Sequence, residues 1–380
     1  MAVDLGTMAL HGPAGEEVFY LQSATFRAFR RDDTIELFFQ VDGVSSSVNP
    51  NATLIEADFR RSAEVSVFLR EFDAAALPCR FEVPCSYDDV IEESVSRLFF
   101  RGCQQDFQQI VVELLTRKGE KFHVRWSGTT DDRDYRDGSK IRKRVVIEGM
   151  FEFLGVKPMF QQITAQTSFI KPFPPFEEVF TEPISQHRKH FLPLLSVDAS
   201  VIDDDLDFWI HFVTPIEPLL EGNVGDWTAT HHDFYNAEGQ VSLQFVGGKY
   251  SFTGDFNFFA YESGAIFEGF PNREEEIHED YRSRITSYEA ASSFFQQYGR
   301  IPWCAEPPLD PTRRSGPLMS QFGGKMAFTN FGELPRNRSG KLFRYIGEIQ
   351  GFSYCHRSAD AILLFYDPDE RIALLRFDWT

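Results

Sequence analysis

The triplet His231-His232-Asp233 carries the residue types best suited to acid–base chemistry in this chain. A carboxylate beside a histidine can hold the imidazole in one tautomer, and the imidazole can then act as a general base. In a strand, His231 and Asp233 would point to the same face and His232 to the other. We therefore name His231 and Asp233 as the candidate catalytic residues. A polar strand edge is the favoured alternative, because no activated Ser or Cys accompanies the pair in sequence.

Two further groups have the residue types of metal ligands. His187 and His190 are three residues apart, and a helix would place both on one face. No Cys or His pair completes a four-ligand zinc site, and Arg188 and Lys189 between them repel a cation. The run Asp203–Asp205 lacks the alternating spacing and the glycine of a calcium loop, so a turn or helix cap is favoured there. We expect no metal site and no cofactor.

Phosphate-binding and hydrolase motifs are missing from the sequence. It contains no GxxxxGK[ST] and no GxGxxG after an expected strand, and Gly323-Gly324-Lys325 does not have the spacing of a phosphate loop. The GxSxG turn that carries the nucleophile of many hydrolases is also absent. These absences favour a protein without enzymatic activity.

The charge balance points to a class of partner. The chain has 57 acidic and 38 basic residues, a formal net charge of −19. Such a field repels phosphate backbones, so we expect no nucleic acid, and it attracts and steers a basic protein partner. Solubility alone is the other explanation of this charge. No run of 18 apolar residues occurs, so we expect no membrane span.

The cysteines and the N-terminus indicate a cytoplasmic protein. Five cysteines are scattered without a CxxC pair, which is typical of reduced thiols rather than of a disulfide framework or a zinc ribbon. The N-terminal residues lack the basic and apolar regions of a secretory signal.

The elements that must position these residues indicate an α+β fold, predominantly antiparallel β, with two sheet-containing domains and few helices. Aromatic residues make up 15% of the chain, with 40 Phe, a composition that suits sheet surfaces. An N-terminal β-rich domain is expected over 1–155, a Pro/Phe-rich connector over 156–184, and a C-terminal α+β region over 185–380. In the first domain, strands are expected at Val18–Phe29, Thr34–Val41, Ala52–Phe59, Glu64–Phe72, Arg80–Val83 and Val145–Leu154.

Three segments of the N-terminal domain are predicted to form a helix, a hairpin and a charged loop. Ser86 is predicted to begin a helix, because it could cap the backbone and Val90, Val95 and Leu98 give a helical face. Residues 107–126 fit a helical spacing, yet their β-branched residues and a turn at 117–120 favour a hairpin. The run from Thr129 to Lys143 is predicted to be a charged loop, in which basic residues could pair with nearby aspartates.

The connector and the C-terminal region differ in composition and in hydrophobic pattern. Prolines block regular structure in 156–184, which predicts a linker or an arm that packs by its Phe rings. Asn272 and Glu275 form a capping box that predicts a helix to Tyr298, ended by Gly299. Strands are expected at Leu206–Val213, Asp226–Tyr235, Gln240–Phe245, Tyr250–Phe252, Phe256–Phe258, Ala265–Phe270, Phe343–Ile349, Ala361–Tyr366 and Ile372–Phe377. Because Ala361–Tyr366 is almost wholly apolar, layers should cover both its faces.

The last segment, about 317–380, resembles the YwqG-like domain family. The resemblance rests on Ser320-Gln-Phe-Gly-Gly-Lys325, on Phe343–Gly351 and on the apolar strand Ala361–Tyr366. The sequence departs from the family at Lys325, where a proline is frequent, and it has no cysteine pair between the two blocks. The resemblance implies a fold and a bacterial, cytosolic lineage, not a reaction.

Three classes of function remain open at this point. Acidity, absent catalytic motifs and the YwqG-like segment favour a non-catalytic bacterial protein that binds a basic protein, for example an immunity-like protein that neutralises a toxin. A hydrolase-type enzyme built on His231 and Asp233 is the first alternative. A small-molecule or carbohydrate-binding protein that uses its aromatic side chains is the second.

Overall fold

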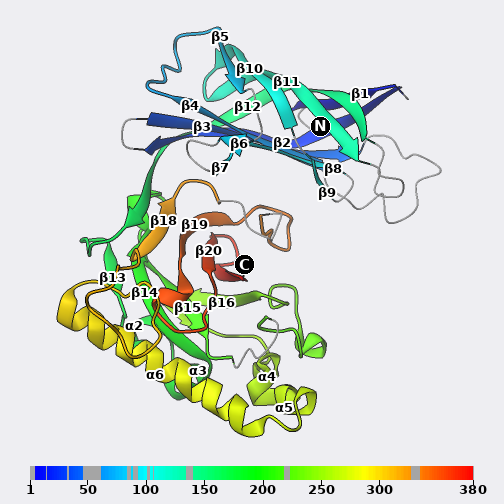
Figure 1. Ribbon diagram of the computed structural model, residues 1–380. Coiled ribbons are helices and arrows are strands. Elements are labelled where there is room, and N and C mark those ends of the chain that lie inside the picture. Colours follow the sequence, from blue (N-terminus) through cyan, green and yellow to red (C-terminus); the bar gives the residue numbers. More distant parts are fainter. Residues whose placement is uncertain are drawn as a thin grey trace. The chain divides into compact units, whose positions relative to one another are not determined.

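The computed structural model describes residues 5–13, 15–31, 34–45, 61–83, 87–88, 93–100, 103–105, 107–133, 140–217, 223–326 and 334–379. Antiparallel sheet dominates these residues and helices are few, which confirms the predicted α+β, predominantly β fold class. The chain divides into two units, Met1–Pro158 and Met159–Thr380, each shown in Figure 1. Independent folding of two domains stays a prediction.

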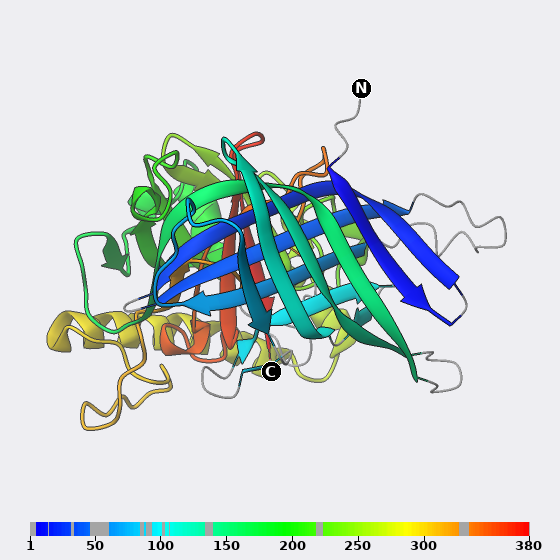
Figure 2. The ribbon, with the colours of Figure 1, turned by 90° about the horizontal axis from the view of Figure 1, so that it is seen from above.

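The first unit is one curved sheet. Its strands pair in the order β9-β8-β4-β3-β2-β1-β12-β11-β10-β5, and the last part of β12 also pairs in parallel with β2. Figure 2 shows how strongly these strands curve. The strands are β1 (Gly6–Gly12), β2 (Gly15–Arg31), β3 (Thr34–Ser45), β4 (Arg61–Leu69), β5 (Cys79–Val83), β8 (Ser96–Phe100), β9 (Cys103–Gln105), β10 (Phe107–Lys118), β11 (Lys121–Arg133) and β12 (Lys140–Ile163), beside the short pair β6 (Tyr87–Asp88) and β7 (Glu93–Ser94).

Aromatic side chains fill the concave side of this sheet. Phe26 and Phe39 of β2 and β3 stack at 4.9 Å, and Phe26 meets Phe122 of β11 edge-on at 5.0 Å. Trp126 is fully buried and lies 6.5 Å from Phe39. Strands from both ends of the pairing order thus share one core, so the period-two alternation in their sequences has a single inward face.

One close approach of strands explains a glycine inside a strand. Gly149 of β12 lies opposite Gly6 of β1. A Cβ atom at Gly149 would lie 2.0 Å from the carbonyl oxygen of Leu5, which no side chain could tolerate. The mid-strand glycine therefore permits β1 to pair with β12.

Two predictions for the first unit were wrong in part. The helix expected from Ser86 is not formed at residues 87–88 and 93–98, the part of this stretch that the structure describes: β6, β7 and β8 lie there, and Val95 and Leu98 enter the sheet core. Pairing of β8 with β4 outweighs the weak local capping signal. The charged loop is mostly strand, because β11 continues to Arg133 and β12 begins at Lys140. Its Asp131 and Arg142 pair across the ladder at 3.2 Å, which confirms the expected ion pairing.

The other predictions for this unit are confirmed where the structure describes them. Residues 107–126 form the β10–β11 hairpin, with Gly119 at a φ of 63° in its turn. Strands β2 and β3 are antiparallel neighbours, although the turn residues Asp32 and Asp33 lie outside the described residues. The expected strand Ala52–Phe59 also lies outside them.

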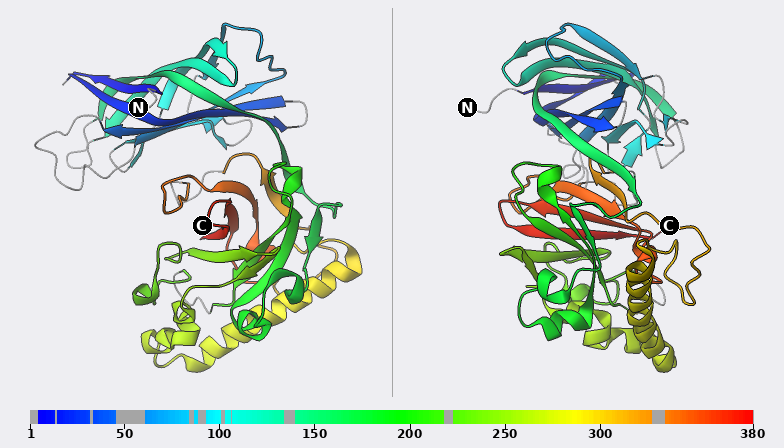
Figure 3. Two further views of the ribbon diagram at one scale, coloured as in Figure 1. Left: turned by 180° about the vertical axis from the view of Figure 1, so that it is seen from behind. Right: turned by 90° about the vertical axis from the view of Figure 1, so that its left-hand side faces the viewer.

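The second unit packs two sheets and several helices around one core (Figure 3). One sheet has the order β17-β16-β21-β20-β19-β18-β12 and the other the order β13-β14-β15. The strands are β13 (Ile170–Pro172), β14 (Phe191–Asp198), β15 (Trp209–Pro215), β16 (Gln240–Val246), β17 (Lys249–Ser251), β18 (Met319–Gly323), β19 (Arg344–Ile349), β20 (Ala361–Asp367) and β21 (Ile372–Asp378). The helices are α2 (Phe176–Val179), α3 (Ile184–His190), α4 (Ala260–Ser263), α5 (Ala265–Gly269), α6 (Glu274–Tyr298), η1 (Ala199–Val201), η2 (Ala229–His231), η3 (Phe256–Phe258) and η4 (Gly351–Ser353).

Strand β20 is covered on both faces, as its apolar sequence predicted. Ile362 and Leu364 belong to the core between the two sheets. Leu363 and Phe365 point the other way, into a smaller cluster with Phe343. The hairpin from β20 to β21 through Asp367–Arg371 and the hairpin at Gly247-Gly248 are also confirmed.

Helix α6 confirms the predicted long helix but not its cap. The N-cap residue is Arg273 rather than Asn272, and it makes no side-chain cap. Three glutamates in the first turn interact favourably with the positive end of the helix dipole instead. Gly299 ends the helix at a φ of 67°, as predicted. Tyr281 and Tyr288 anchor the helix by donating hydrogen bonds to the backbone oxygens of Lys189 and Pro193.

Long apolar helices are not a feature of this fold. Among the described residues, no helix combines the length and the hydropathy needed to cross a membrane.

Three expected strands and the connector turned out differently in the second unit. Asp226–Tyr235 forms turns and η2, and the stretch 256–270 forms η3, α4 and α5, not strands. Its phenylalanines had suggested a sheet surface, yet Gly264 at a φ of 82° turns the chain between two short helices. The connector residues 156–163 belong to β12, and Phe169 and Phe173 pack against the core, as expected for an arm.

His211 joins the two sheets of this unit through a buried hydrogen-bond network. Its Nε2–H donates to the carbonyl of Gly248 at 3.0 Å, so its Nδ1 accepts from the Ser196 hydroxyl at 2.7 Å. The Tyr250 hydroxyl bridges the backbone N–H and oxygen of His211. Burial lowers the pKa of His211 to about 4 from an ordinary 6.5.

This network predicts a loss of stability in acid. Between pH 6.5 and 4 the unfolded chain binds a proton at His211 that the folded chain does not. The free energy of unfolding therefore falls as pH drops, by up to about 1.4 kcal/mol per pH unit from this group. His211→Gln can still donate to Gly248 but does not titrate. We expect a flatter pH dependence than for wild type in urea unfolding from pH 7 to 4.5. An equally steep slope in the variant would contradict this role, and the partly exposed His278→Gln is the control.

Candidate functional site

His231 and Asp233 do not form the expected pair. His231 ends η2, and its Nδ1 lies 2.6 Å from Oδ2 of Asp255. Asp233 accepts hydrogen bonds from the backbone of Tyr235 and Asn236 and from the Asn236 side chain. The strand that would have placed both on one face is absent, so each residue shapes its own turn. Among the described residues, no Ser or Cys side chain is hydrogen-bonded to His231.

The other sequence candidates are structural. His187 and His190 lie on α3 and are buried, not solvated as expected. His187 donates from Nδ1 to the Pro183 oxygen and accepts at Nε2 from the Phe252 N–H, so both of its nitrogens are in use. Burial lowers the pKa of His190 to about 4. Asp203 accepts from the Asp205 N–H, the turn that the sequence favoured.

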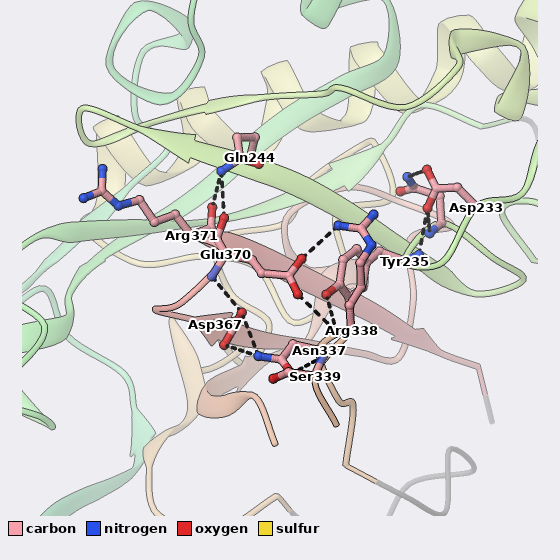
Figure 4. A network of polar contacts seen from close by, with 10 residues as sticks. Asp233, Tyr235, Gln244, Asn337, Arg338, Ser339, Asp367, Glu370 and Arg371 are labelled. Atoms are coloured by element: carbon pink, nitrogen blue, oxygen red, sulfur yellow. Dashed lines mark hydrogen bonds and ion pairs between the residues drawn. The ribbon is translucent and has the colours of Figure 1, made fainter. Parts of the chain in front are cut away.

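The turn that Asp233 shapes leads into a polar network around Tyr235 and Arg338 (Figure 4). The Arg338 N–H lies 3.0 Å from the Tyr235 hydroxyl and 3.1 Å from the Glu370 carboxylate. The Arg338 guanidinium lies over the Tyr235 ring and pairs with Glu370 at 2.9 Å. The network therefore joins three segments that are far apart in the sequence.

Asn337 is the buried centre of this network. Its side-chain oxygen accepts from the N–H groups of Ser339 and Lys341, and its amide nitrogen lies 3.2 Å from Asp367. The Asp367 carboxylate also accepts from the Glu370 N–H. Asn337 and Asp367 are each only 2% exposed, so the bond between their side chains forms away from water. The network therefore has a structural role: it stabilises the turn between β20 and β21.

Asn337→Ala should destabilise the second unit by about 2 kcal/mol or more, because it removes the side-chain donor to the buried Asp367 carboxylate and the shared acceptor of two backbone N–H groups. The exposed Ser339→Ala removes one bond to the same asparagine oxygen and should cost less than about 1 kcal/mol. Chemical unfolding of both variants measures the difference. Equal stability of the two variants would show that Asn337 is not the centre of the network.

An exposed aromatic residue marks a different surface. Trp227 is 40% exposed, and its ring packs edge-on against Phe270 at 5.2 Å. It lies over Gly269, where a Cβ would come within 2.9 Å of the indole. Phe267 and Phe270 both pack against a small core made by α4, α5 and Ile277 of α6. These helices thus hold a large apolar ring in a defined position at the surface.

Exposed glutamates lie on α4, α5 and α6, the helices that form this small core. We define the acidic aromatic surface as Trp227, Phe267 and Phe270 together with Glu262, Glu268, Glu274, Glu275 and Glu279. All five of these glutamates are exposed. Glu275 lies 3.6 Å from Arg282 and Glu274 lies 3.7 Å from His278. Within the described part of the chain, no cation pairs with Glu268 or Glu279, so their charges are directed to solvent.

A buried carboxyl supports this surface from beneath. Glu217 is 1% exposed, and its Oε1 accepts from the Tyr261 N–H of α4 at 3.0 Å. Burial raises the pKa of Glu217 to about 8 from an ordinary 4.5, so the group is protonated at neutral pH. Its Oε2 is among the buried side-chain atoms without a hydrogen-bond partner. The first turn of α4 is therefore held by a neutral acid.

The raised pKa of Glu217 predicts that the protein becomes less stable as pH rises. Between pH 4.5 and 8 the folded chain keeps a proton that the unfolded chain releases, so the free energy of unfolding falls as pH rises. Glu217→Gln keeps the acceptor but cannot ionise. Its stability relative to wild type should rise by up to about 1.4 kcal/mol per pH unit from pH 5 to 8. Thermal unfolding across this range measures it, with the exposed Glu268→Gln as control. A constant difference would mean that Glu217 is ionised when folded.

A third cluster escaped the sequence analysis. Cys304 and Glu306 follow α6, and His356 follows η4. The Cys304 sulfur lies 3.8 Å from Nδ1 of His356, and Nε2 of His356 lies 4.0 Å from Glu306. Burial lowers the pKa of His356, which favours the neutral imidazole. The three residues span more than 50 positions without a local motif, so only the short spacing Cys304-x-Glu306 could have drawn attention to them.

Comparisons with protein-family models, with curated proteins and with solved structures found no match to this chain. The YwqG-like resemblance of residues 317–380 therefore stays a prediction. The acidic aromatic surface is the candidate that combines an exposed large ring, Trp227, with exposed glutamates.

Proposed function

We propose that this protein is non-catalytic and acts by binding a basic protein partner through its acidic aromatic surface. The observation that carries the proposal is Trp227, an exposed indole held on Phe270 at the end of α5, with exposed glutamates on α4, α5 and α6. Tryptophan is among the residues most enriched at the energetic centres of protein interfaces. Exposed carboxylates on the neighbouring helices select a partner of opposite charge and speed its association.

The support beneath this surface favours binding without rearrangement. Ile266 and Ile277 are fully buried in the small core under the surface. Tyr261 stacks on Tyr281 at 4.4 Å, which ties α4 to α6. A pre-organised surface loses little conformational entropy when a partner binds. The rigid placement of Trp227 therefore adds affinity for a partner that offers an apolar pocket with a basic rim.

The net charge of −19 extends the same preference to the whole chain. Long-range attraction of this kind raises association rates for a basic protein, and added salt weakens it. We propose an immunity-like role in a bacterial cytoplasm, in which the partner is a basic toxin that the protein neutralises. Fast capture would matter most for such a partner, because a free toxin acts before it is bound.

Co-purification at low and high salt tests the proposal. Basic proteins retained by the immobilised chain at low salt are identified by mass spectrometry, and their affinity is then measured by calorimetry. Trp227→Ala should weaken binding about 30-fold or more, the effect of losing an interface hot spot. Glu268→Lys should mainly slow association and reduce the dependence on salt.

Glu178→Lys is the matched control, because it makes the same charge change at an exposed residue of α2. It should leave the affinity within about threefold of wild type. Equal loss of affinity in Glu178→Lys and Glu268→Lys would show that net charge alone attracts the partner. Full affinity in Trp227→Ala would place the interface elsewhere.

A further inference from the structure

Cys304, Glu306 and His356 bring three different metal-ligating side chains together. One ligand atom from each lies within 4.8 Å of the other two, and this is the only such group of His, Cys, Asp or Glu within the described residues. Cys304 and His356 are partly buried, and Glu306 is exposed. A thiol, an imidazole and a carboxylate at this spacing are the donors that zinc takes from proteins.

Hydrogen bonds hold the two segments in place on both sides of the cysteine. The Ser353 hydroxyl donates to the oxygen of Trp303 at 2.8 Å, and the Ala305 N–H donates to the oxygen of Phe352 at 2.9 Å. The backbone N–H of His356 donates to the Ser287 hydroxyl of α6 at 3.0 Å. The ligand-bearing backbone is therefore fixed before any ion binds, which is the requirement for a precise site.

The charges near the cluster suit a divalent ion. A thiolate and the Glu306 carboxylate together supply two negative charges. The neighbouring arginines interact elsewhere, since Arg284 and Arg357 both bond to the buried carboxylate of Asp280. That carboxylate holds the guanidinium groups on the α6 side and offsets part of their repulsion of a cation.

We propose that Cys304, His356 and Glu306 bind one Zn²⁺ ion, with a fourth position open to water. The separation of 3.8 Å between the sulfur and Nδ1 is close to the roughly 3.5 Å expected between two ligands of tetrahedral zinc, given bond lengths of about 2.3 and 2.0 Å. The exposed Glu306 side chain completes the set by a rotation. A thiolate and an imidazole select zinc over magnesium or calcium, which prefer oxygen ligands.

Cobalt(II) titration of the purified, metal-stripped chain tests the site. One Co²⁺ per chain should bind and give a near-ultraviolet band from charge transfer between thiolate and cobalt. Cys304→Ser should abolish this band, and His356→Gln should weaken binding about tenfold or more. Cys79→Ser is the matched control, because Cys79 is a free, partly buried thiol of the first unit. The band should persist in this control.

A readout on the wild-type chain removes any dependence on variant folding. Zn²⁺ should slow alkylation of Cys304 by iodoacetamide about tenfold or more, because a coordinated thiolate is withdrawn from reaction. It should leave the rate at Cys79 unchanged, as mass spectrometry of the two peptides would show. Equal alkylation of Cys304 with and without Zn²⁺, or a cobalt band that survives in Cys304→Ser, would overturn the proposal.

Discussion

Burial of β20 on both faces is the constraint on which the second unit depends. A strand with no polar face needs two layers of side chains, and the chain supplies them from different segments. The core between the sheets covers Ile362 and Leu364, while Phe343, Tyr235 and neighbouring residues cover Leu363 and Phe365. Part of the second cover is the loop that carries Phe343, and its backbone bonds from Phe343 to Pro335 and from Asn337 to Lys341 lie within the loop itself. The hydrogen bond from Asn337 to Asp367 fixes this loop over β20. The polar network therefore serves to keep an apolar strand covered.

The elements that were predicted most reliably have a clear hydrophobic pattern or a residue that marks their end. β16, β20 and β21 have clear patterns, and α6 has a long helical face with Gly299 at its end. The predictions failed where local composition and tertiary context disagree. The aromatic run 256–270 was predicted to form strands, but it forms short helices. Phe267 and Phe270 of this run pack in a small core with Ile277 of α6, and Trp227 packs against Phe270. No window of sequence contains those contacts.

The candidate functional residues show the same limit of prediction from local sequence. His231 and Asp233 attracted attention because they are neighbours in sequence, yet each is bound to a different group. Cys304 and His356 are 52 residues apart and meet because η4 and the segment after α6 exchange backbone hydrogen bonds. Glu275 was predicted to be the capping-box partner of Asn272. The short helices that hold Trp227 against Phe270 include α5, which was predicted to be a strand.

Helix α6 relates the two proposed sites. The acidic aromatic surface lies around its first turns, and Cys304 follows its last residue by six positions. A helix of 25 residues is about 37 Å long, so the two ends of α6 are far apart. The middle of the helix nevertheless contacts the metal-site segment, because Ser287 binds the His356 backbone and Arg284 binds the oxygen of Arg357. An ion at Cys304 would therefore stabilise the same helix that presents the glutamates, and it would do so without touching the partner. Loss of the metal should then lower the stability of the second unit while the association rate with a basic protein stays unchanged, since that rate depends on surface charge.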